Sequence, residues 1–220
     1  MGKNIRYVGA LLPYNNRKVE EFAHSHKLQG SKKVILVTQG TAEKDVNKLI
    51  VPTLEAFKDT DYIVVATTAG SQTKELQSRY AHENIIIEDF IDYNYIMPRA
   101  AVYVTNGGYG GVLLAISHKL PMVAAGVHEG KNEITARVGY FKLGINLKTE
   151  LPKPQQISES VREVLSNGMY KTNVTKVAEE FKQYHPHTLC AKYFYDLLYN
   201  SSPKHAGYSN LVRQLEKDFS

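Results

Sequence analysis

Residues 102–117 read VYVTNGGYGGVLLAIS, a short apolar run followed by a glycine-rich turn and an apolar segment of helical length. Its glycines, Gly107, Gly108, Gly110 and Gly111, let the backbone turn tightly and approach a ligand closely. The helix that follows presents free N–H groups and about half a positive charge at its N-terminus. A strand-to-helix connection alone needs fewer glycines, so we favour a binding site for an anion such as phosphate.

This turn departs from the two common phosphate-binding motifs. It lacks the Gly-Lys-Ser/Thr ending of a P-loop, and it lacks the Gly-x-Gly-x-x-Gly pattern of dinucleotide-binding folds. The pattern therefore argues against ATP hydrolysis and against NAD-dependent chemistry.

The glycine turn lies within a regular alternation of apolar runs and segments of helical period. Such alternation is typical of βαβ units whose parallel sheet is buried on both faces. The expected strands are residues 34–37, 62–66, 85–87, 102–104, 122–124 and 144–147. The helices expected between them are residues 45–57, 72–79, one ending near 117 and one beginning near 132. We predict an α/β fold, a Rossmann-like doubly wound parallel sheet of about six strands with helices on both faces.

The segments outside this alternation are expected to be mainly helical. Residues 5–12 read as an extended segment, and helices are expected at residues 19–28, 155–165, 174–184, 187–198 and 210–219. We predict a lead-in at residues 1–30, one Rossmann-like domain at residues 31–200, and a polar helix or tail at residues 201–220.

Composition restricts the class of protein. The chain has 220 residues, 43% of them hydrophobic and 22% charged, without a low-complexity tract, as a folded globular protein does. No apolar run reaches the roughly 20 residues that span a bilayer, and the N-terminus lacks the apolar core of a signal peptide. The single cysteine, Cys190, excludes an intrachain disulfide and favours a reducing compartment, so we expect a cytoplasmic protein.

Charge and histidine spacing restrict the partners. A formal charge of +5 and a pI near 9.0 suit an anionic partner. The basic residues are scattered, however, and no basic helix is interleaved with aromatic residues, so we expect no nucleic-acid groove. His185 and His187 have no carboxylate or cysteine at the spacing of metal ligands, so we expect no metal site.

Two further strands are followed by candidate ligand-binding residues. Gln39, Gly40 and Thr41 follow the first strand, at the edge where open α/β sheets bind ligands. Thr41 can donate to a phosphate or cap the following helix, and the sequence leaves both roles open. Phe90 can stack on a base or close the core, and the residues alone favour the core.

The loop at residues 126–133 is unusually polar. Its side chains, His128, Glu129, Lys131 and Glu133, can bind sugar hydroxyls and phosphate. The competing interpretation makes Glu133 an acid in the first turn of a helix and Lys131 a solvated charge. The density of polar groups favours a binding site.

Several short blocks, taken in order, resemble the nucleotide-sugar domain of the UDP-dependent glycosyltransferases of the two-Rossmann (GT-B) class. That class includes plant enzymes and bacterial enzymes of the macrolide and flavonoid type. The blocks are residues 37–41, 90–91, 97–100, 106–111, 120–123, 136–138 and 144–147, and a looser likeness covers about residues 5–165.

The resemblance implies a UDP-sugar donor of the UDP-glucose type and no other cofactor. Phe90 would stack on the uracil, and the backbone of Ile91 would read it. The turn at residues 106–111 would hold the diphosphate, and the loop at residues 128–133 would approach the sugar. The implied donor-binding residues are Gln39, Gly40, Thr41, Phe90, Ile91, Asn106, Gly107, Gly108, Tyr109, Gly110, Gly111, His128, Glu129, Lys131, Asn132 and Glu133.

Several positions depart from the family pattern, among them Gly130 and Lys131, where relatives commonly have an acidic residue followed by glutamine. Many relatives have histidine where Asn106 stands and asparagine-serine where Gly110 and Gly111 stand. A ribose-binding glutamate is common where this chain has Leu114, so that contact would move to Glu133 or be lost. A bacterial sub-branch with Asn-Gly-Gly-Tyr-Gly-Gly and a downstream Lys-x-Glu resembles this chain more closely.

Family enzymes also have an N-terminal Rossmann domain that binds the acceptor and usually supplies the catalytic base. Residues 1–20 resemble the join to such a domain. The resemblance therefore implies the donor-binding domain of a glycosyltransferase that transfers a hexose to a small-molecule or lipid acceptor. This domain would hold no catalytic residue and would be inactive without an N-terminal domain or a separate subunit, as in the eukaryotic two-subunit transferase acting on dolichol-linked sugar.

Two other functions stay open. A non-catalytic nucleotide-sugar-binding or assembly module would keep the fold without the ribose contact, and Leu114 favours it. A GT-B epimerase would need a pair of carboxylates near the sugar, for which Glu129 and Glu133 are the candidates.

Overall fold

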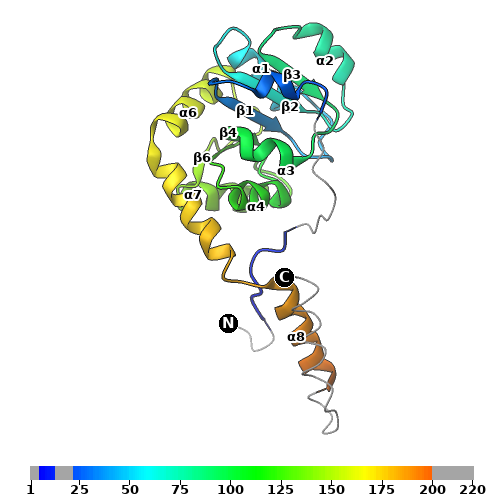
Figure 1. Cartoon of the computed structure of the whole chain (residues 1–220), viewed down its shortest axis with the longest axis vertical. Helices are drawn as coiled ribbons and strands as arrows, with labels where there is room; N and C mark the ends of the chain where they lie inside the picture. Colours follow the sequence, from blue (N-terminus) through cyan, green and yellow to red (C-terminus); the bar gives the residue numbers. More distant parts are fainter. Residues whose placement is uncertain (1–4, 13–21, 200–220) are drawn as a thin grey trace. The chain divides into compact units, whose positions relative to one another are not determined.

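The computed structural model describes residues 5–12 and 22–199, which belong to two compact units (Figure 1). Of the described residues, 22–178 form one unit, which contains the sheet, and 5–12 and 179–199 form the other. The helix expected at residues 210–219 lies outside the described residues, as does the first part of the one expected at 19–28. The domain boundaries expected at residues 30 and 200 stay predictions.

Six parallel strands form one sheet in the order β3-β2-β1-β4-β5-β6, which confirms the predicted fold class. The strands are β1 (Val34–Thr38), β2 (Ile63–Thr67), β3 (Ile85–Glu88), β4 (Ala100–Thr105), β5 (Met122–Ala124) and β6 (Gly144–Asn146). Leu36 of β1 pairs with Val65 of β2 on one side and with Tyr103 of β4 on the other. The strand order reverses at β1 and β4, and ligands of such sheets bind beyond the carboxyl ends of the strands at that point.

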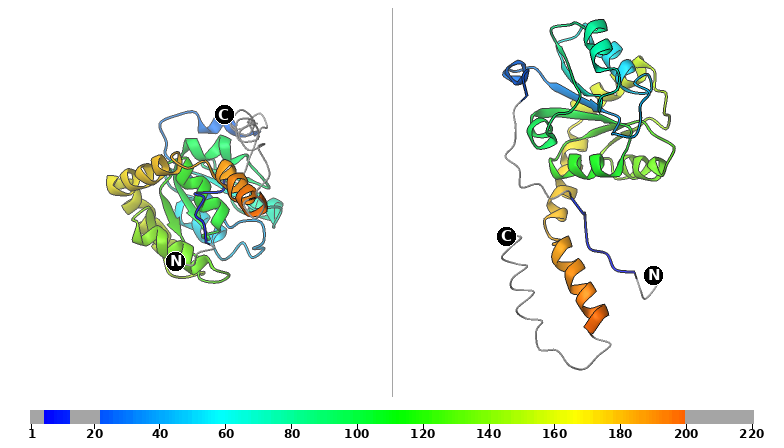
Figure 2. Two further views of the ribbon diagram at one scale, coloured as in Figure 1. Left: turned by 90° about the horizontal axis from the view of Figure 1, so that it is seen from below. Right: turned by 90° about the vertical axis from the view of Figure 1, so that its right-hand side faces the viewer.

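Helices cover both faces of this sheet (Figures 1 and 2). Ile35 and Val104 pack in one core cluster with Phe57 of α1 and Val161 of α6, so these two helices cover one face. Helices α4 and α5 contact each other and cover the other face, against β4 and β5. The helices of this unit are η1 (Ser25–Leu28), α1 (Ile50–Phe57), α2 (Thr73–Arg79), α3 (Tyr93–Ile96), η2 (Met97–Arg99), α4 (Tyr109–Ser117), α5 (Lys131–Tyr140), α6 (Pro154–Ser166) and most of α7 (Gly168–Phe181).

Helix α1 begins later than the sequence pattern predicts. It starts at Ile50 rather than near Asp45, because Pro52 fits only the first turn of a helix, where no N–H donor is needed. The Asp45 side chain instead accepts a hydrogen bond from the Asn47 N–H at 3.0 Å and forms a turn. Thr41 therefore does not cap this helix, and that interpretation of Thr41 is wrong.

The second unit is built from residues 5–12, the end of α7, and α8 (Pro186–Tyr199). Residues 5–12 contain no helix or strand. Gly9 has a φ of +92°, and the Tyr184 side chain occupies the space that a Cβ at Gly9 would need. The Arg6 guanidinium carbon lies 6.0 Å from the ring centroid of Tyr193. These contacts join the two distant ends of the chain within this unit.

No helix within the described part of the chain is long and apolar enough to cross a membrane.

Candidate functional site

A pocket of about 250 Å³ opens where β1, β2 and β3 end. Its lining residues are Gly40, Thr41, Thr67, Ala69, Asp89, Phe90, Ile91 and Tyr93. The structure thus brings together four residues that the sequence predicts for donor binding, although they come from two separate loops. Phe90 is 69% exposed, so the interpretation that it closes the core is wrong. An exposed aromatic ring beside a pocket of this size suits stacking on a planar base.

A hydrogen-bond network holds the loop that carries Phe90. The Thr73 hydroxyl donates to the Asp89 carboxylate and lies 2.5 Å from the Thr68 hydroxyl. The Ala69 N–H donates to the Asp89 carbonyl at 2.9 Å. This network joins the loops after β2 and β3. Sequence reasoning missed it, although the position of Asp89 directly before Phe90 was a usable signal.

The glycine turn lies at the N-terminus of α4. Gly108 is the N-cap residue, and no side chain caps this end, so the first N–H groups of α4 are available to an anion. Gly107 has a φ of +78°, and a Cβ there would collide with the Thr135 methyl group. Gly110 differs, because a Cβ there would meet no atom within 4 Å. Gly107 is therefore required by packing, whereas Gly110 borders free space.

Asn106 organises this turn through both ends of its amide. Its Nδ2 donates to the Gln39 carbonyl, and its Oδ1 accepts from the Gly108 N–H at 3.3 Å. A Cβ at Gly40 would lie 3.8 Å from the Asn106 Nδ2, so the pocket and the glycine turn are adjacent. Because one N–H of Nδ2 is used in the first of these bonds, only the second N–H of the Asn106 amide is left to donate to a phosphate.

Gln39 fixes the loop after β1 rather than lining the pocket. Its side chain is buried, and its Nε2 donates to the Asp45 carbonyl at 2.9 Å. Its Oε1 is a buried acceptor without a hydrogen-bond partner among the described residues. The structure therefore places Gln39 behind the site, where it supports Gly40 and Thr41.

The polar loop before α5 adjoins the other side of the glycine turn. A Cβ at Gly107 would lie 3.8 Å from the Lys131 Cβ. The Lys131 side chain is only 15% exposed and pairs with Glu129 at 2.7 Å, so it is not a solvated charge. His128, Glu129 and Asn132 are exposed at this loop.

Glu133, in contrast, pairs with a residue of its own helix, α5. Its side chain is 73% exposed, and its carboxylate lies 3.9 Å from the Arg137 guanidinium, one helical turn further on. It is also the acidic residue of the first helical turn, as its structural interpretation predicts. Glu129 and Glu133 thus pair with different cations, and the carboxylate pair that an epimerase would need is not formed by these contacts.

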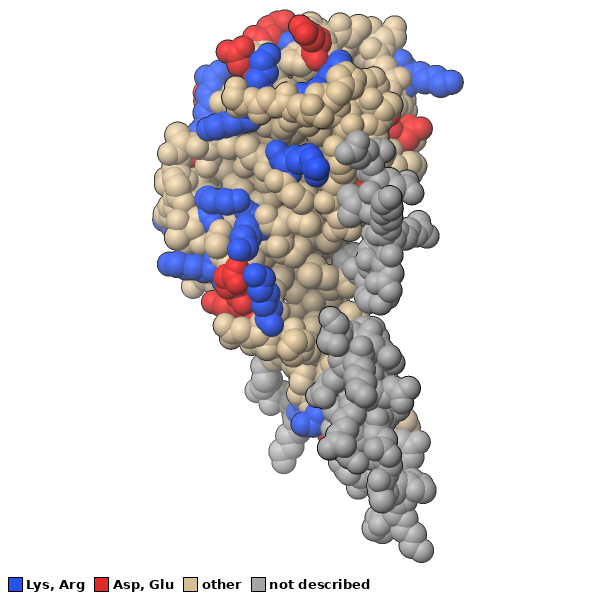
Figure 3. All heavy atoms as spheres, viewed as in Figure 1, with Lys and Arg blue, Asp and Glu red and all other residues tan. Residues whose placement is uncertain are grey.

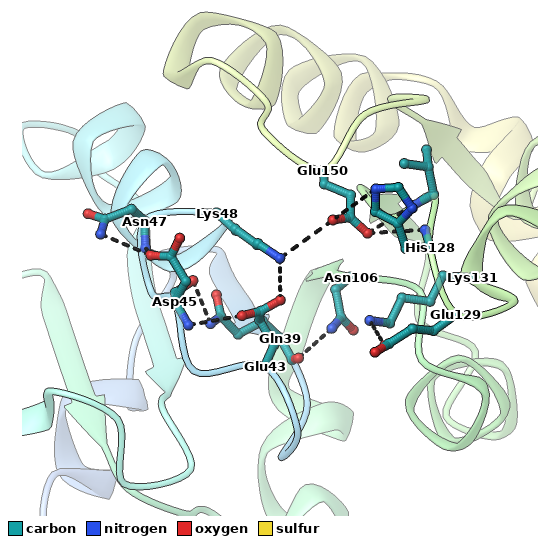
Figure 4. A network of polar contacts seen from close by, with 11 residues as sticks. Gln39, Glu43, Asp45, Asn47, Lys48, Asn106, His128, Glu129, Lys131 and Glu150 are labelled. Carbon is teal, nitrogen blue, oxygen red and sulfur yellow. Dashed lines mark hydrogen bonds and ion pairs between the residues drawn. The ribbon is translucent and has the colours of Figure 1, made fainter.

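A charged bridge that sequence reasoning missed crosses this edge of the sheet (Figure 4). The Lys48 ammonium lies 2.6 Å from a Glu43 carboxylate oxygen and 3.5 Å from one of Glu150. The hydrogen bond to Glu43 raises the pKa of Lys48, and the same bond lowers the pKa of Glu43. Glu150 follows β6, and this place after a strand was the one signal in the sequence that could have marked it as a residue of the site.

The described residues contain no group of three or more His, Cys, Asp or Glu side chains that could hold a metal ion. On the face of the sheet-containing unit shown in Figure 3, Lys and Arg side chains are spread among uncharged surface and acidic residues.

The chain matches the family described as "Erythromycin biosynthesis protein CIII-like, C-terminal domain" over residues 52–192. It belongs to this EryCIII-like family. The matched range of the EryCIII-like domain includes the pocket residues Phe90 and Ile91, the glycine turn, and the polar loop before α5.

Curated relatives of this EryCIII-like domain are glycosyltransferases. It is 37% identical over 179 residues to UDP-glucosyltransferase 1 of Beauveria bassiana, covering 80% of this chain and 39% of the relative. It is 33% identical over 184 residues to 4'-demethylrebeccamycin synthase of Lentzea aerocolonigenes, covering 82% of this chain and 42% of the relative. The chain thus spans about two fifths of the length of these relatives.

Solved glycosyltransferase structures share its fold. The calicheamicin glycosyltransferase CalG4 matches with a TM-score of 0.67 at 20% identity, over 83% of this chain and 44% of that chain. Os79 from O. sativa, solved in complex with UDP, matches with a TM-score of 0.65 at 18% identity, over 74% and 39%. The EryCIII-like domain therefore has the fold of the C-terminal half of a GT-B glycosyltransferase, as the sequence predicts.

Proposed function

We propose that this chain is the donor-binding domain of a UDP-sugar-dependent glycosyltransferase that transfers a hexose to a small-molecule or lipid acceptor. The observation that carries the proposal is the direct adjacency of two sites. A pocket with an exposed Phe90 lies beside an uncapped helix N-terminus, and Gly40 and Asn106 join them. A nucleoside diphosphate has the same two parts in the same order, a planar base and an anionic diphosphate.

The chemistry of such a domain is electrostatic. The free N–H groups and the dipole of α4 would stabilise the negative charge that builds up on the departing diphosphate. This role needs no covalent residue. The base that activates the acceptor would come from an N-terminal domain or a separate subunit, which agrees with the greater length of the relatives. The cytoplasmic location expected from the sequence is part of the same proposal.

Calorimetric titration with UDP tests the proposal. Wild-type chain should bind UDP, and Asn106→Asp should weaken binding, because the new carboxylate repels phosphate and cannot donate to the Gln39 carbonyl. Asn173→Asp is the matched control, since Asn173 lies on α7 and its amide donates to the Lys142 carbonyl. The control should bind UDP like the wild type. Absence of UDP binding by a folded wild-type chain at millimolar ligand would refute the proposal.

A non-catalytic nucleotide-sugar-binding or assembly module is the second candidate. It is favoured by Leu114, which lies partly buried on α4, and by Glu133, which pairs with Arg137 rather than replacing a lost ribose contact. Fusing the chain to the N-terminal domain of one of its relatives separates the two functions. Hexose transfer from UDP-glucose by the fusion supports a transferase, whereas UDP binding without transfer supports the module.

A further inference from the structure

We infer that Glu150, held in place by Lys48, is a positioning residue for the sugar-side loop at residues 126–131. Through this loop it sets the preference of the site for a UDP-sugar over UDP alone. The inference rests on the proposed function, because it concerns the sugar end of the same donor.

Glu150 binds the backbone of the loop directly. Its Oε1 accepts hydrogen bonds from the His128 N–H at 3.1 Å and from the Val127 N–H at 3.4 Å. Its Oε2 lies 3.8 Å from the His128 Nε2. The Glu150 side chain is only 16% exposed, whereas the His128 side chain beside it is 75% exposed. The carboxylate therefore fixes the backbone from which the sugar-side groups extend.

The other side of the loop is fixed by packing. The backbone of Gly126 lies so close to the Asn106 carbonyl that a Cβ at Gly126 would collide with it. The Thr135 hydroxyl donates to the Gly126 carbonyl at 3.2 Å. Gly126 is thus held to the diphosphate turn, and the Val127 and His128 N–H groups are held by Glu150. The His128 carbonyl accepts a hydrogen bond from the Lys131 N–H at 2.9 Å at the start of α5.

Lys48 holds Glu150 from the opposite direction. Figure 4 shows its ammonium between the carboxylates of Glu43 and Glu150. Lys48 precedes α1 and Glu150 precedes α6, and these helices pack on the same face of the sheet. The bridge therefore ties the loop after β1 to the loop after β6, on either side of the glycine turn in the strand order.

Glu150 is kept ionised by these partners. Partial burial acts to raise the pKa of its carboxyl group, but the His128 and Val127 amides and the charges of His128 and Lys48 outweigh it and lower the pKa. An ionised carboxylate accepts stronger hydrogen bonds from backbone amides than a neutral group does.

The effect should be confined to the sugar end of the donor. The loop adjoins the glycine turn at Gly107, whereas the pocket with Phe90 lies on the Gly40 side of Asn106. Loosening the loop should therefore disturb contacts to the sugar and leave the base and the diphosphate in place.

Titration of the whole chain with UDP and with UDP-glucose tests this inference. Glu150→Gln should weaken UDP-glucose binding about fivefold to tenfold, the scale of one net hydrogen bond, and leave UDP binding unchanged. Lys48→Met should act in the same direction. Lys48→Arg should keep the wild-type ratio of UDP-glucose affinity to UDP affinity, because it keeps the positive charge. Glu163→Gln is the matched control, since Glu163 lies on α6 and accepts from Asn167.

Each other outcome has a distinct meaning. Equal losses for UDP and UDP-glucose, or a fall in thermal stability with an unchanged affinity ratio, would overturn the inference in favour of a merely structural role. Tighter UDP-glucose binding by Glu150→Gln would also overturn it, because Glu150 would then occupy amides that the sugar needs. Absence of UDP binding by the wild type would instead remove the proposed function, on which the inference depends.

Discussion

The hydroxyl group of Tyr103 lies 2.7 Å from the Oγ1 of Thr38, which joins β4 to β1 at the point where the strand order reverses. The same hydroxyl lies under the glycine turn, where a Cβ at Gly111 would stand 2.8 Å from it. Burial raises the pKa of the Tyr103 phenol well above its ordinary range, so this group stays neutral. Gly111 is therefore needed by the packing of α4 on the sheet, independently of any ligand.

We predict that Gly111→Ala destabilises the fold. The new methyl group would press on the buried Tyr103 hydroxyl, and such overpacking costs about 1–3 kcal/mol in the free energy of unfolding. Urea unfolding of the variant and the wild type measures this cost. A Gly111→Ala variant as stable as the wild type would show that Tyr103 moves aside freely.

The neighbouring substitution, Gly110→Ala, should have the opposite pattern. A Cβ at Gly110 meets no atom within 4 Å, and alanine favours a helix over glycine by about 1 kcal/mol, so stability should hold or rise. UDP affinity should fall, because the methyl group would enter the space expected to hold the diphosphate. Parallel unfolding and titration experiments separate the two effects. Unchanged UDP affinity would remove Gly110 from the site.

Thr73→Val should loosen the base end of the site. The substitution keeps the side-chain shape and removes the hydroxyl that donates to Asp89 beside Phe90. UDP affinity should fall about fivefold, the scale of one net hydrogen bond, while pyrophosphate affinity stays unchanged. Thr172→Val is the matched control, because the Thr172 hydroxyl bonds within α7 to the Gly168 carbonyl. Equal losses for UDP and pyrophosphate would show that Thr73 does not act through the base.

The sequence predicted the strands of the sheet closely, but it predicted the first residues of the helices less accurately. Strands buried on both faces read as continuous apolar runs, so residues 34–37 and 122–124 were found within a residue of β1 and β5. Helix starts depend on single residues. The pattern placed α1 five residues early because it gave no weight to Pro52. It also missed residues 168–173 of α7, none of which is fully buried.

The candidate site was predictable where its residues are close in sequence and share a motif. The glycine turn and the pocket residues Phe90 and Ile91 were found in this way. The bridge from Lys48 to Glu150 was not, because no pattern along the chain connects the loop after β1 with the loop after β6. Contacts of this kind follow from strand order, and strand order was not fixed by the sequence pattern alone.

Stability should fall on the acid side of neutrality. Lys48 lowers the pKa of Glu43, Lys58 lowers that of Glu55, and the pKa of Glu150 is also lowered. As the pH falls, the unfolded chain takes up these protons first, near the ordinary pKa of 4.5. The free energy of unfolding therefore decreases as the pH falls. The contribution is complete above 4.5 and is lost as the pH passes down through the lower folded values.

Urea unfolding between about pH 6 and about pH 3.5 measures this linkage. The decline should be shallower in Glu55→Gln, which cannot take up a proton at that position. An identical decline in the variant and the wild type would show that Glu55 does not contribute.

Leu114→Glu should create a preference for a ribose over a deoxyribose. Leu114 lies on α4 where the family resemblance implies a ribose-binding glutamate, and Glu133 pairs with Arg137 instead of taking over. Wild-type chain should therefore bind UDP and 2′-deoxy-UDP with similar affinity. The new carboxylate can accept from the ribose hydroxyls, and a hydrogen bond to a charged group should raise the preference for UDP about tenfold. Leu114→Ala controls for loss of the leucine side chain, and unfolding experiments on both variants check that the partly buried position tolerates the change. A strong preference for UDP in the wild type would contradict the prediction, because another residue would then already bind the ribose.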